Sequence, residues 1–210
     1  MSSGTQATAP RRVVVFDLGG VLLDWNPRYL YRKLFDGDEA AMERFLAEVC
    51  TSEWNVRQDA GRSFEDAIAA LMPEHAVKLP LIRAWRDRFS EMIPDALHDT
   101  VAVAADLKAR GVPLYALTNW SAETFPSQRK RFAFLDWFGG IVVSGEEKVV
   151  KPDPRIFEVL LDRYGLAADE TVFIDDSPKN AQGATAVGIH GIHFRSAAQL
   201  RGELAQLALL

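Results

Sequence analysis

The sequence predicts an α/β fold, a doubly wound parallel sheet with a helical cap inserted after the first strand. Short, continuous apolar runs rich in β-branched residues recur along the chain, which is typical of strands buried on both faces of a parallel sheet. Amphipathic helical patterns alternate with these runs in the second half of the chain. Residues 27–95 instead contain several amphipathic stretches and no convincing strand, which indicates a helical insertion.

The first predicted strand, residues 13–16, ends at Asp17 and two glycines that permit a tight turn. Four more strands are predicted at residues 112–117, 141–143, 171–174 and 191–194. A helix is predicted at 99–110, before Gly111, and another at 153–164, where an aspartate caps a proline-initiated first turn.

The chain divides into three segments on this pattern. Its first ten residues are small and polar, so residues 1–12 are expected to form a disordered tail. Residues 13–26 and 96–210 are expected to form the core domain, and residues 27–95 the helical cap over the sheet.

The composition is that of an ordinary globular protein, with 48% hydrophobic and 25% charged residues. A formal net charge of −5 argues against nucleic-acid and anionic-membrane partners, and the short basic cluster at 129–131 is interpreted as a solvated helix end. Cys50 is the only cysteine, which excludes an intrachain disulfide and a thiolate metal site. With neither a signal peptide nor a membrane span indicated, we expect a cytoplasmic protein; the sequence does not fix its oligomeric state.

Polar side chains stand at or just beyond the ends of the predicted strands: Asp17, Thr118, Lys151 and the pair Asp175 and Asp176. Because ligands bind at the carboxyl ends of strands in open parallel sheets, we expect these groups to meet. A carboxylate nucleophile, oxygen ligands for a magnesium ion, and a hydroxyl with a lysine form a set suited to phosphoryl transfer. Carboxylates would repel a phosphate unless a divalent cation lay between them, so the acid cluster itself argues for Mg²⁺.

Four motifs in order resemble those of the haloacid dehalogenase-like superfamily: FDLGGVLLD at 16–24, LTNWS at 117–121, KPDPRIF at 151–157 and FIDDSPKNAQGA at 173–184. The resemblance covers the chain from residue 13 to about 194, and the helical insertion stands where that family has its cap. It implies a Rossmann-like core and a phosphatase that hydrolyses a small phosphorylated metabolite, with sugar phosphates among the candidates.

The resemblance also implies catalytic roles. Asp17 would attack phosphorus and form an aspartyl-phosphate, while Lys151 would neutralise charge on Asp17 and on the transferring group. Thr118 and the backbone amide of Asn119 would bind phosphoryl oxygens. The alternative for Thr118 is a hydroxyl that only satisfies the strand end.

A magnesium site is implied by the same motifs. Asp176 would bind the ion directly together with Asp17 and the backbone carbonyl of Gly19. Asp175 would hold a metal-bound water or Lys151. The alternative for the aspartate pair is a helix cap, but two adjacent carboxylates after an apolar strand favour the metal.

The sequence departs from the family pattern at Gly19, where related phosphatases carry a second aspartate that protonates the leaving oxygen and then activates water. Loss of such a general acid–base group typically costs ~10²–10⁴ in rate. The loss matters less for a good leaving group, such as that of an anomeric or acyl phosphate. Asp24 is a possible substitute, although a role in shaping the entry into the cap is the favoured interpretation.

Two other functions remain open. A 2-haloacid dehalogenase would use Asp17 to displace halide from carbon without a metal, but Asp175 and Asp176 argue against that branch. A non-catalytic protein of the same fold that binds a phosphorylated ligand or a partner has only Gly19 in its favour.

Substrate specificity is expected to come from the cap. The candidates to face the cleft are Trp54, Arg57, Arg62, Trp85 and Arg86, with the cap core as the alternative place for the two tryptophans. Trp120 is expected to form a wall of the site.

Overall fold

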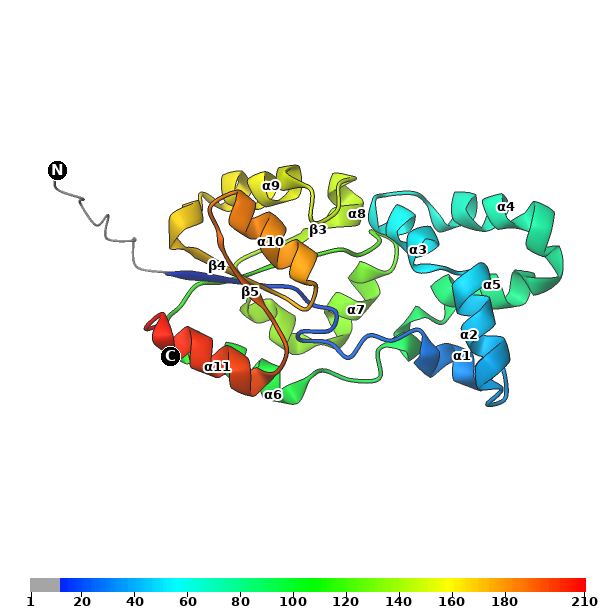
Figure 1. Cartoon of the computed structure of the whole chain (residues 1–210), viewed down its shortest axis with the longest axis horizontal. Coiled ribbons are helices and arrows are strands. Elements are labelled where there is room, and N and C mark those ends of the chain that lie inside the picture. The colour runs from blue at the N-terminus through cyan, green and yellow to red at the C-terminus, as the bar shows by residue number, and fades with distance from the viewer. Residues whose placement is uncertain (1–11) are drawn as a thin grey trace, which may run out of the picture.

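The computed structural model describes residues 12–210, so the predicted tail lies outside the described residues except for Arg12. A sheet with helices on both faces forms one part of the molecule, and a helical part lies beside it (Figure 1). The strands are β1 Val13–Phe16, β2 Leu114–Thr118, β3 Ile141–Val143, β4 Thr171–Asp175 and β5 His190–His193. The helices of the helical part are α1 Arg28–Leu34, α2 Glu39–Glu48, α3 Ser52–Asp59, α4 Phe64–His75 and α5 Leu79–Asp87. Those around the sheet are α6 His98–Ala109, α7 Phe125–Arg131, α8 Ser144–Glu147, α9 Pro154–Tyr164, α10 Pro178–Ala186 and α11 Ala197–Gln206.

All five strands are parallel, in the order β3-β2-β1-β4-β5, which confirms the predicted fold class. Helices α9 and α10 cover one face of the sheet, while α6 and α11 cover the other (Figure 1). The chain leaves β1 for β2 on one side and reaches β4 on the other, so β1 stands at the point where the strand order reverses. Ligands of such sheets bind in the crevice at this point.

Three of the five strands differ from the prediction at their ends, and the last of these runs from His190 to His193 rather than over 191–194. The second strand starts at Leu114 rather than at residue 112, because Gly111 has a φ of +77° and Pro113 has no amide hydrogen for the sheet. The fourth strand continues through Asp175, whose Cα pairs with that of His193. This extra residue places the Asp175 side chain in the sheet and leaves Asp176 as the first residue beyond it.

Three helices of the helical part, α2, α3 and α4, begin at side-chain caps. The side chain of Asp38 accepts from the amide of Ala41, and Thr51 and Ser63 cap α3 and α4 in the same way. Their apolar faces enclose an aromatic core in which the rings of Trp54 and Trp85 lie 5.5 Å apart, edge to face.

Two linkers join the helical part to the sheet, and they run alongside each other. The amide of Leu97 donates to the carbonyl of Leu22 at 2.8 Å, and the amide of Asn26 donates to the carbonyl of Met92 at 2.8 Å. The guanidinium of Arg131 donates to the carbonyl of Ile93 at 2.6 Å. Arg131 therefore binds a linker, whereas the sequence indicated only a solvated helix end.

Within residues 12–210, no helix has the length and apolar character needed to cross a membrane.

Candidate active site

The Asp17 side chain lies at the carboxyl end of the central strand. Its amide continues the β1–β4 pairing by donating to the carbonyl of Ile174 at 2.8 Å. One carboxylate oxygen accepts from the Leu18 amide at 2.7 Å and lies 3.0 Å from Lys151 Nζ. Burial raises the pKa of the Asp17 carboxyl to about 7, against the opposing attraction of the Lys151 ammonium. Additional positive charge beside Asp17 would therefore favour its nucleophilic, ionised form.

The loop after Asp17 depends on Gly20. Gly20 has a φ of +72°, and its amide donates to the carbonyl of Leu23 at 2.9 Å. A Cβ atom on Gly20 would lie 2.3 Å from Asp176 Oδ2, so the backbone passes directly against that carboxylate. Gly19 differs, because its φ is ordinary and its nearest neighbour for a Cβ atom is the Trp25 Cβ at 3.8 Å.

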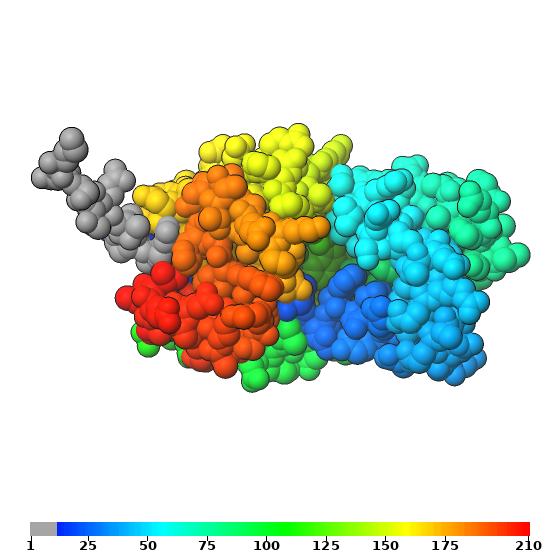
Figure 2. Space-filling model, viewed as in Figure 1, coloured from blue at the N-terminus to red at the C-terminus, as the bar shows by residue number. Residues whose placement is uncertain are grey.

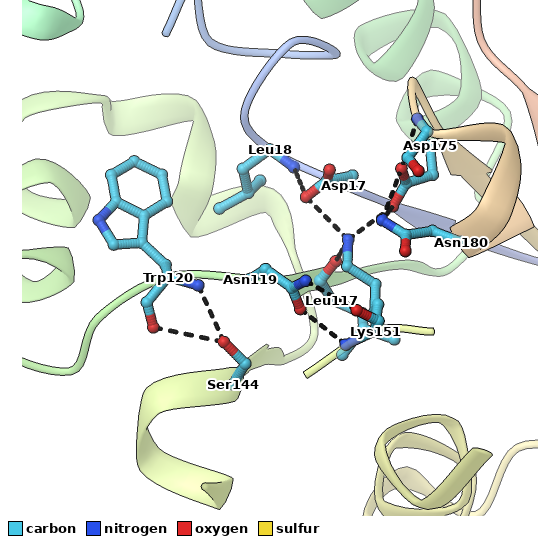
Figure 3. A network of polar contacts seen from close by, with 10 residues as sticks. Asp17, Leu18, Leu117, Asn119, Trp120, Ser144, Lys151, Asp175 and Asn180 are labelled. Atoms are coloured by element: carbon cyan, nitrogen blue, oxygen red, sulfur yellow. Dashed lines mark hydrogen bonds and ion pairs between the residues drawn. The ribbon is translucent and has the colours of Figure 1, made fainter. Parts of the chain in front are cut away.

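The Lys151 ammonium is fully buried and joins three elements (Figure 3). It donates to Asp175 Oδ2 at 2.6 Å and to the carbonyl of Leu117 at 2.8 Å, in addition to its contact with Asp17. Burial alone lowers the pKa of Lys151, but the two carboxylates outweigh burial and raise it above its ordinary value. Lys151 is therefore a fixed positive charge beside Asp17.

Asn119 holds the main chain of Lys151 in place. Its amide side chain accepts from the Lys151 amide at 2.8 Å and donates to the Lys151 carbonyl at 3.1 Å (Figure 3). Thr118 is buried at the end of β2, and both Thr118 and Asn119 line the cavity described below.

Both oxygens of Asp175 are engaged within the protein. Besides Lys151, they accept from the Ser177 amide at 2.8 Å and from Asn180 Nδ2 at 3.1 Å and 3.2 Å. Of the roles considered for Asp175, holding Lys151 is the one whose contacts are present, and Asp175 also accepts from the amide of Ser177, the residue before α10. Asp176 is exposed on the same cavity, and burial together with the Asp175 carboxylate raises its pKa.

The carboxylates fit a divalent cation. Asp17, Asp175 and Asp176 each offer an oxygen, and these oxygens lie within 4.8 Å of one another. Because the oxygens of Asp175 already have donors, Asp17 and Asp176 are the carboxylates best placed to bind an ion directly. Such hard oxygen donors suit Mg²⁺.

These groups form the floor of a cavity of about 710 Å³ between the sheet and the helical part. The floor includes Asp17, Gly19, Thr118, Asn119 and Asp176. Residues of α1, α2 and α3, together with Trp85 of α5 and Phe89, form the opposite wall. Figure 2 shows one face of the molecule, where the helical part meets the sheet.

Comparison with known families identifies the chain. Residues 11–188 match the family model of haloacid dehalogenase-like hydrolases. The chain belongs to that family.

The haloacid dehalogenase-like hydrolase has phosphatases among its relatives. It is 30% identical over 199 residues to the sesquiterpene phosphatase of Aspergillus oryzae, covering 93% of this chain and 96% of the relative. It is 28% identical over 188 residues to the phosphoglycolate phosphatase of Yersinia pseudotuberculosis, and that match covers 84% of this chain and 78% of the relative. The chain is therefore an enzyme, and its relatives support phosphoric monoester hydrolysis.

Solved structures show the same fold. A family enzyme of Bacteroides thetaiotaomicron, in complex with magnesium and inorganic phosphate, superposes with a TM-score of 0.66 at 24% identity. That match covers 88% of this chain and 94% of the other.

Most of the residues that the sequence suggested as facing the cleft of this haloacid dehalogenase-like hydrolase do not line the cavity. Trp85 and Trp120 line the cavity, but Trp54, Arg57, Arg62 and Arg86 do not. The Trp54 indole donates to the carbonyl of Ala67 at 3.2 Å and belongs to the cap core.

Sequence reasoning missed several residues that line the cavity, namely Trp25, which precedes the cap, and Arg28, Glu43, Asn55 and Asp59 in the cap. Asn55 and Asp59 are one helical turn apart, a spacing that places them on one face of α3. That spacing was readable in the sequence, but it does not tell which face meets the sheet.

Proposed function

We propose that the protein is a magnesium-dependent phosphatase that hydrolyses a small phosphorylated metabolite through an aspartyl-phosphate on Asp17. The observation that carries the proposal is that Asp17 and Asp176 lie together on the floor of the cavity, with the buried Lys151 ammonium 3.0 Å from Asp17. A nucleophilic carboxylate beside a fixed ammonium and a free second carboxylate is the arrangement that phosphoryl transfer to an aspartate requires.

Asp17 is the group that attacks phosphorus in this proposal. Its oxygen that contacts Lys151 and the Leu18 amide is held in place, which leaves the other oxygen for the attack. Lys151 offsets the negative charge that gathers on the transferring group, and Thr118 with the Asn119 amide binds its peripheral oxygens. Mg²⁺ held by Asp17, Asp176 and the Gly19 carbonyl would neutralise the phosphoryl charge beside these carboxylates.

The cavity wall supports a substrate with a sizeable organic part. Trp25, Trp85, Phe89 and Trp120 supply ring surfaces that suit a hydrocarbon or a sugar ring. Sugar phosphates and terpenoid phosphates both carry such an organic part, and the Aspergillus relative is a sesquiterpene phosphatase.

A substrate screen tests the proposal directly. We expect turnover with Mg²⁺ of at least one member of a panel of sugar phosphates, terpenyl phosphates, phosphoglycolate and phosphoserine. An enzyme that hydrolyses no phosphate ester but releases halide from a 2-haloacid in the presence of a chelator would be a dehalogenase instead. A cytoplasmic location and the lack of nucleic-acid and membrane partners stay predictions.

Removal of divalent cations is expected to abolish turnover, and Mg²⁺ is expected to restore it. The reason is electrostatic, since Asp17 and Asp176 would otherwise face a phosphate dianion unscreened. A second readout is the melting temperature, which Mg²⁺ should raise in the wild-type protein and not in Asp176→Asn, because binding to the folded state stabilises it. Full activity in chelator would contradict the proposal.

Gly20→Ala is expected to weaken magnesium binding by about 10–100-fold, the typical cost of disturbing a neighbour of a metal ligand. The added Cβ would meet Asp176 Oδ2 at 2.3 Å and would also strain a backbone with a φ of +72°. The measurement is the Mg²⁺ concentration that gives half-maximal turnover. Gly19→Ala is the matched variant and should lose far less, because its Cβ has room. Equal effects of the two substitutions would contradict this reasoning.

A further inference from the structure

Because Gly19 stands where related phosphatases have an acid, another residue of the cavity must protonate the leaving oxygen. Departure of an alkoxide from phosphorus is slow unless its oxygen receives a proton. Asp24, the substitute considered from the sequence, does not line the cavity, and its carboxylate accepts from the Tyr29 hydroxyl at 2.9 Å. The proton must therefore come from elsewhere.

Only one of the acidic side chains that line the cavity in the described part of the chain is suited to donate this proton. Among the described residues that line the cavity, the acidic side chains are Asp17, Glu43, Asp59, Asp176 and the thiol of Cys50. Glu43 is paired with Arg28 at 2.5 Å and 2.7 Å, and this contact lowers its pKa, so it holds no proton to give. Burial raises the pKa of the Cys50 thiol to about 12, which makes it a poor acid. Asp17 is the nucleophile and Asp176 the proposed metal ligand, so Asp59 remains.

We infer that Asp59, at the end of α3 in the cap, is the general acid and base that replaces the missing aspartate. The inference rests on the phosphatase activity proposed above. In the first step an Asp17 oxygen bonds to phosphorus, the bond from phosphorus to the ester oxygen breaks, and that oxygen takes the proton of Asp59. In the second step water attacks phosphorus, Asp59 takes back a proton from the water, and the bond to Asp17 breaks. Alcohol and inorganic phosphate leave, and both aspartates are restored.

The surroundings of Asp59 suit a group that gains and loses a proton. Asp59 is only 8% exposed, and it forms no ion pair among the described residues. Its carboxyl accepts from Asn55 Nδ2 at 2.9 Å and from the Ser121 amide, which are both neutral donors. Burial raises its pKa to about 7, and Lys151 is the charged group whose attraction opposes this rise. A pKa near neutrality is the value at which one group serves as both acid and base.

Asp59 is also anchored to the core, although it belongs to the cap. The hydroxyl of Ser144 donates to the Asp59 carbonyl at 2.6 Å, and the Trp120 amide donates to the same hydroxyl at 2.9 Å. Ser121, which donates to the Asp59 carboxyl, follows Trp120 directly. The carboxyl is therefore held against the loop that carries Thr118 and Asn119, where the phosphoryl group is expected.

The test compares two leaving groups in Asp59→Asn. The specificity constant kcat/KM should fall by about 10²–10³-fold for an alkyl phosphate, whose leaving oxygen needs the proton. It should fall by less than about tenfold for p-nitrophenyl phosphate, whose leaving oxygen is already acidic. Glu43→Gln removes a carboxylate from the same cavity and should change both esters by a similar factor. If Asp59→Asn does not fold, Asp59→Ser keeps an acceptor for the Ser121 amide and allows the same comparison.

Rescue separates a chemical role from a structural one. Gly19 has space for a side chain, so Gly19→Asp in the Asp59→Asn protein should restore alkyl phosphate turnover by at least about tenfold. Equal losses on both esters, or no rescue, would overturn the role of Asp59 while leaving the phosphatase proposal intact. No turnover of any phosphate ester by the wild-type enzyme would overturn the phosphatase proposal, and the role of Asp59 with it.

Discussion

Asp17→Asn is expected to reduce phosphatase turnover by at least about 10⁴-fold, in keeping with the cost of removing a covalent nucleophile in other enzymes. An amide of the same shape keeps an oxygen for the Leu18 amide and for Lys151, but it carries no charge with which to attack phosphorus. The measurement is steady-state turnover with Mg²⁺, alongside thermal unfolding to show that the fold is intact.

Asp24→Asn is the matched control, because Asp24 lies in the same loop region and does not line the cavity. It should keep turnover within a few-fold of the wild-type rate. Activity of Asp17→Asn within tenfold of wild type would remove Asp17 from the nucleophile's role.

Lys151→Ala is expected to lower turnover by about 10³-fold, the upper range for the loss of a single preorganised donor at a developing charge. It should also lower stability by about 3–5 kcal/mol, because the buried carboxylates of Asp17 and Asp175 would be left without an opposite charge. Both effects are measurable on one preparation, by turnover and by denaturant unfolding at the temperature of the assay.

Lys148→Ala, which removes an exposed ammonium from the same loop, is the control and should change neither quantity greatly. A Lys151→Ala enzyme with a normal rate would exclude the lysine from the site. A loss of stability without a loss of rate would make Lys151 purely structural.

The sheet and the floor of the site were predictable because both depend on local sequence signals and simple geometry. Apolar runs predicted the strands, and a parallel sheet brings the carboxyl ends of its strands to one edge. Asp17, Thr118 and Asp175 therefore meet although they are far apart in the chain. Lys151 reaches the same point from a loop. The resemblance implied its pairing with Asp17 and Asp175, but its hydrogen bonds with Asn119 and the Leu117 carbonyl emerged only from the folded structure.

The cap wall was less predictable, since helical spacing gives the faces of a helix but not the surface that each face meets. From the sequence, Trp54 and Trp85 were equally candidates to face the cleft, but only Trp85 lines the cavity. The sequence did not indicate Asp59 as a site residue, because a single aspartate near a helix end is ordinarily exposed to solvent. Its significance comes from burial, which arises from packing against Ser121 and Ser144.

The paired linkers make the cap a replaceable unit. The amide of Leu97 and the carbonyl of Leu22 are 2.8 Å apart, so the whole insertion leaves and re-enters the core at nearly one point. A core built this way can close with an insertion of almost any length, because the entropy of joining two nearby ends grows slowly with the length between them. Natural variation can therefore exchange the surface that selects the organic part of the substrate and leave the phosphoryl chemistry at the end of β1 unchanged.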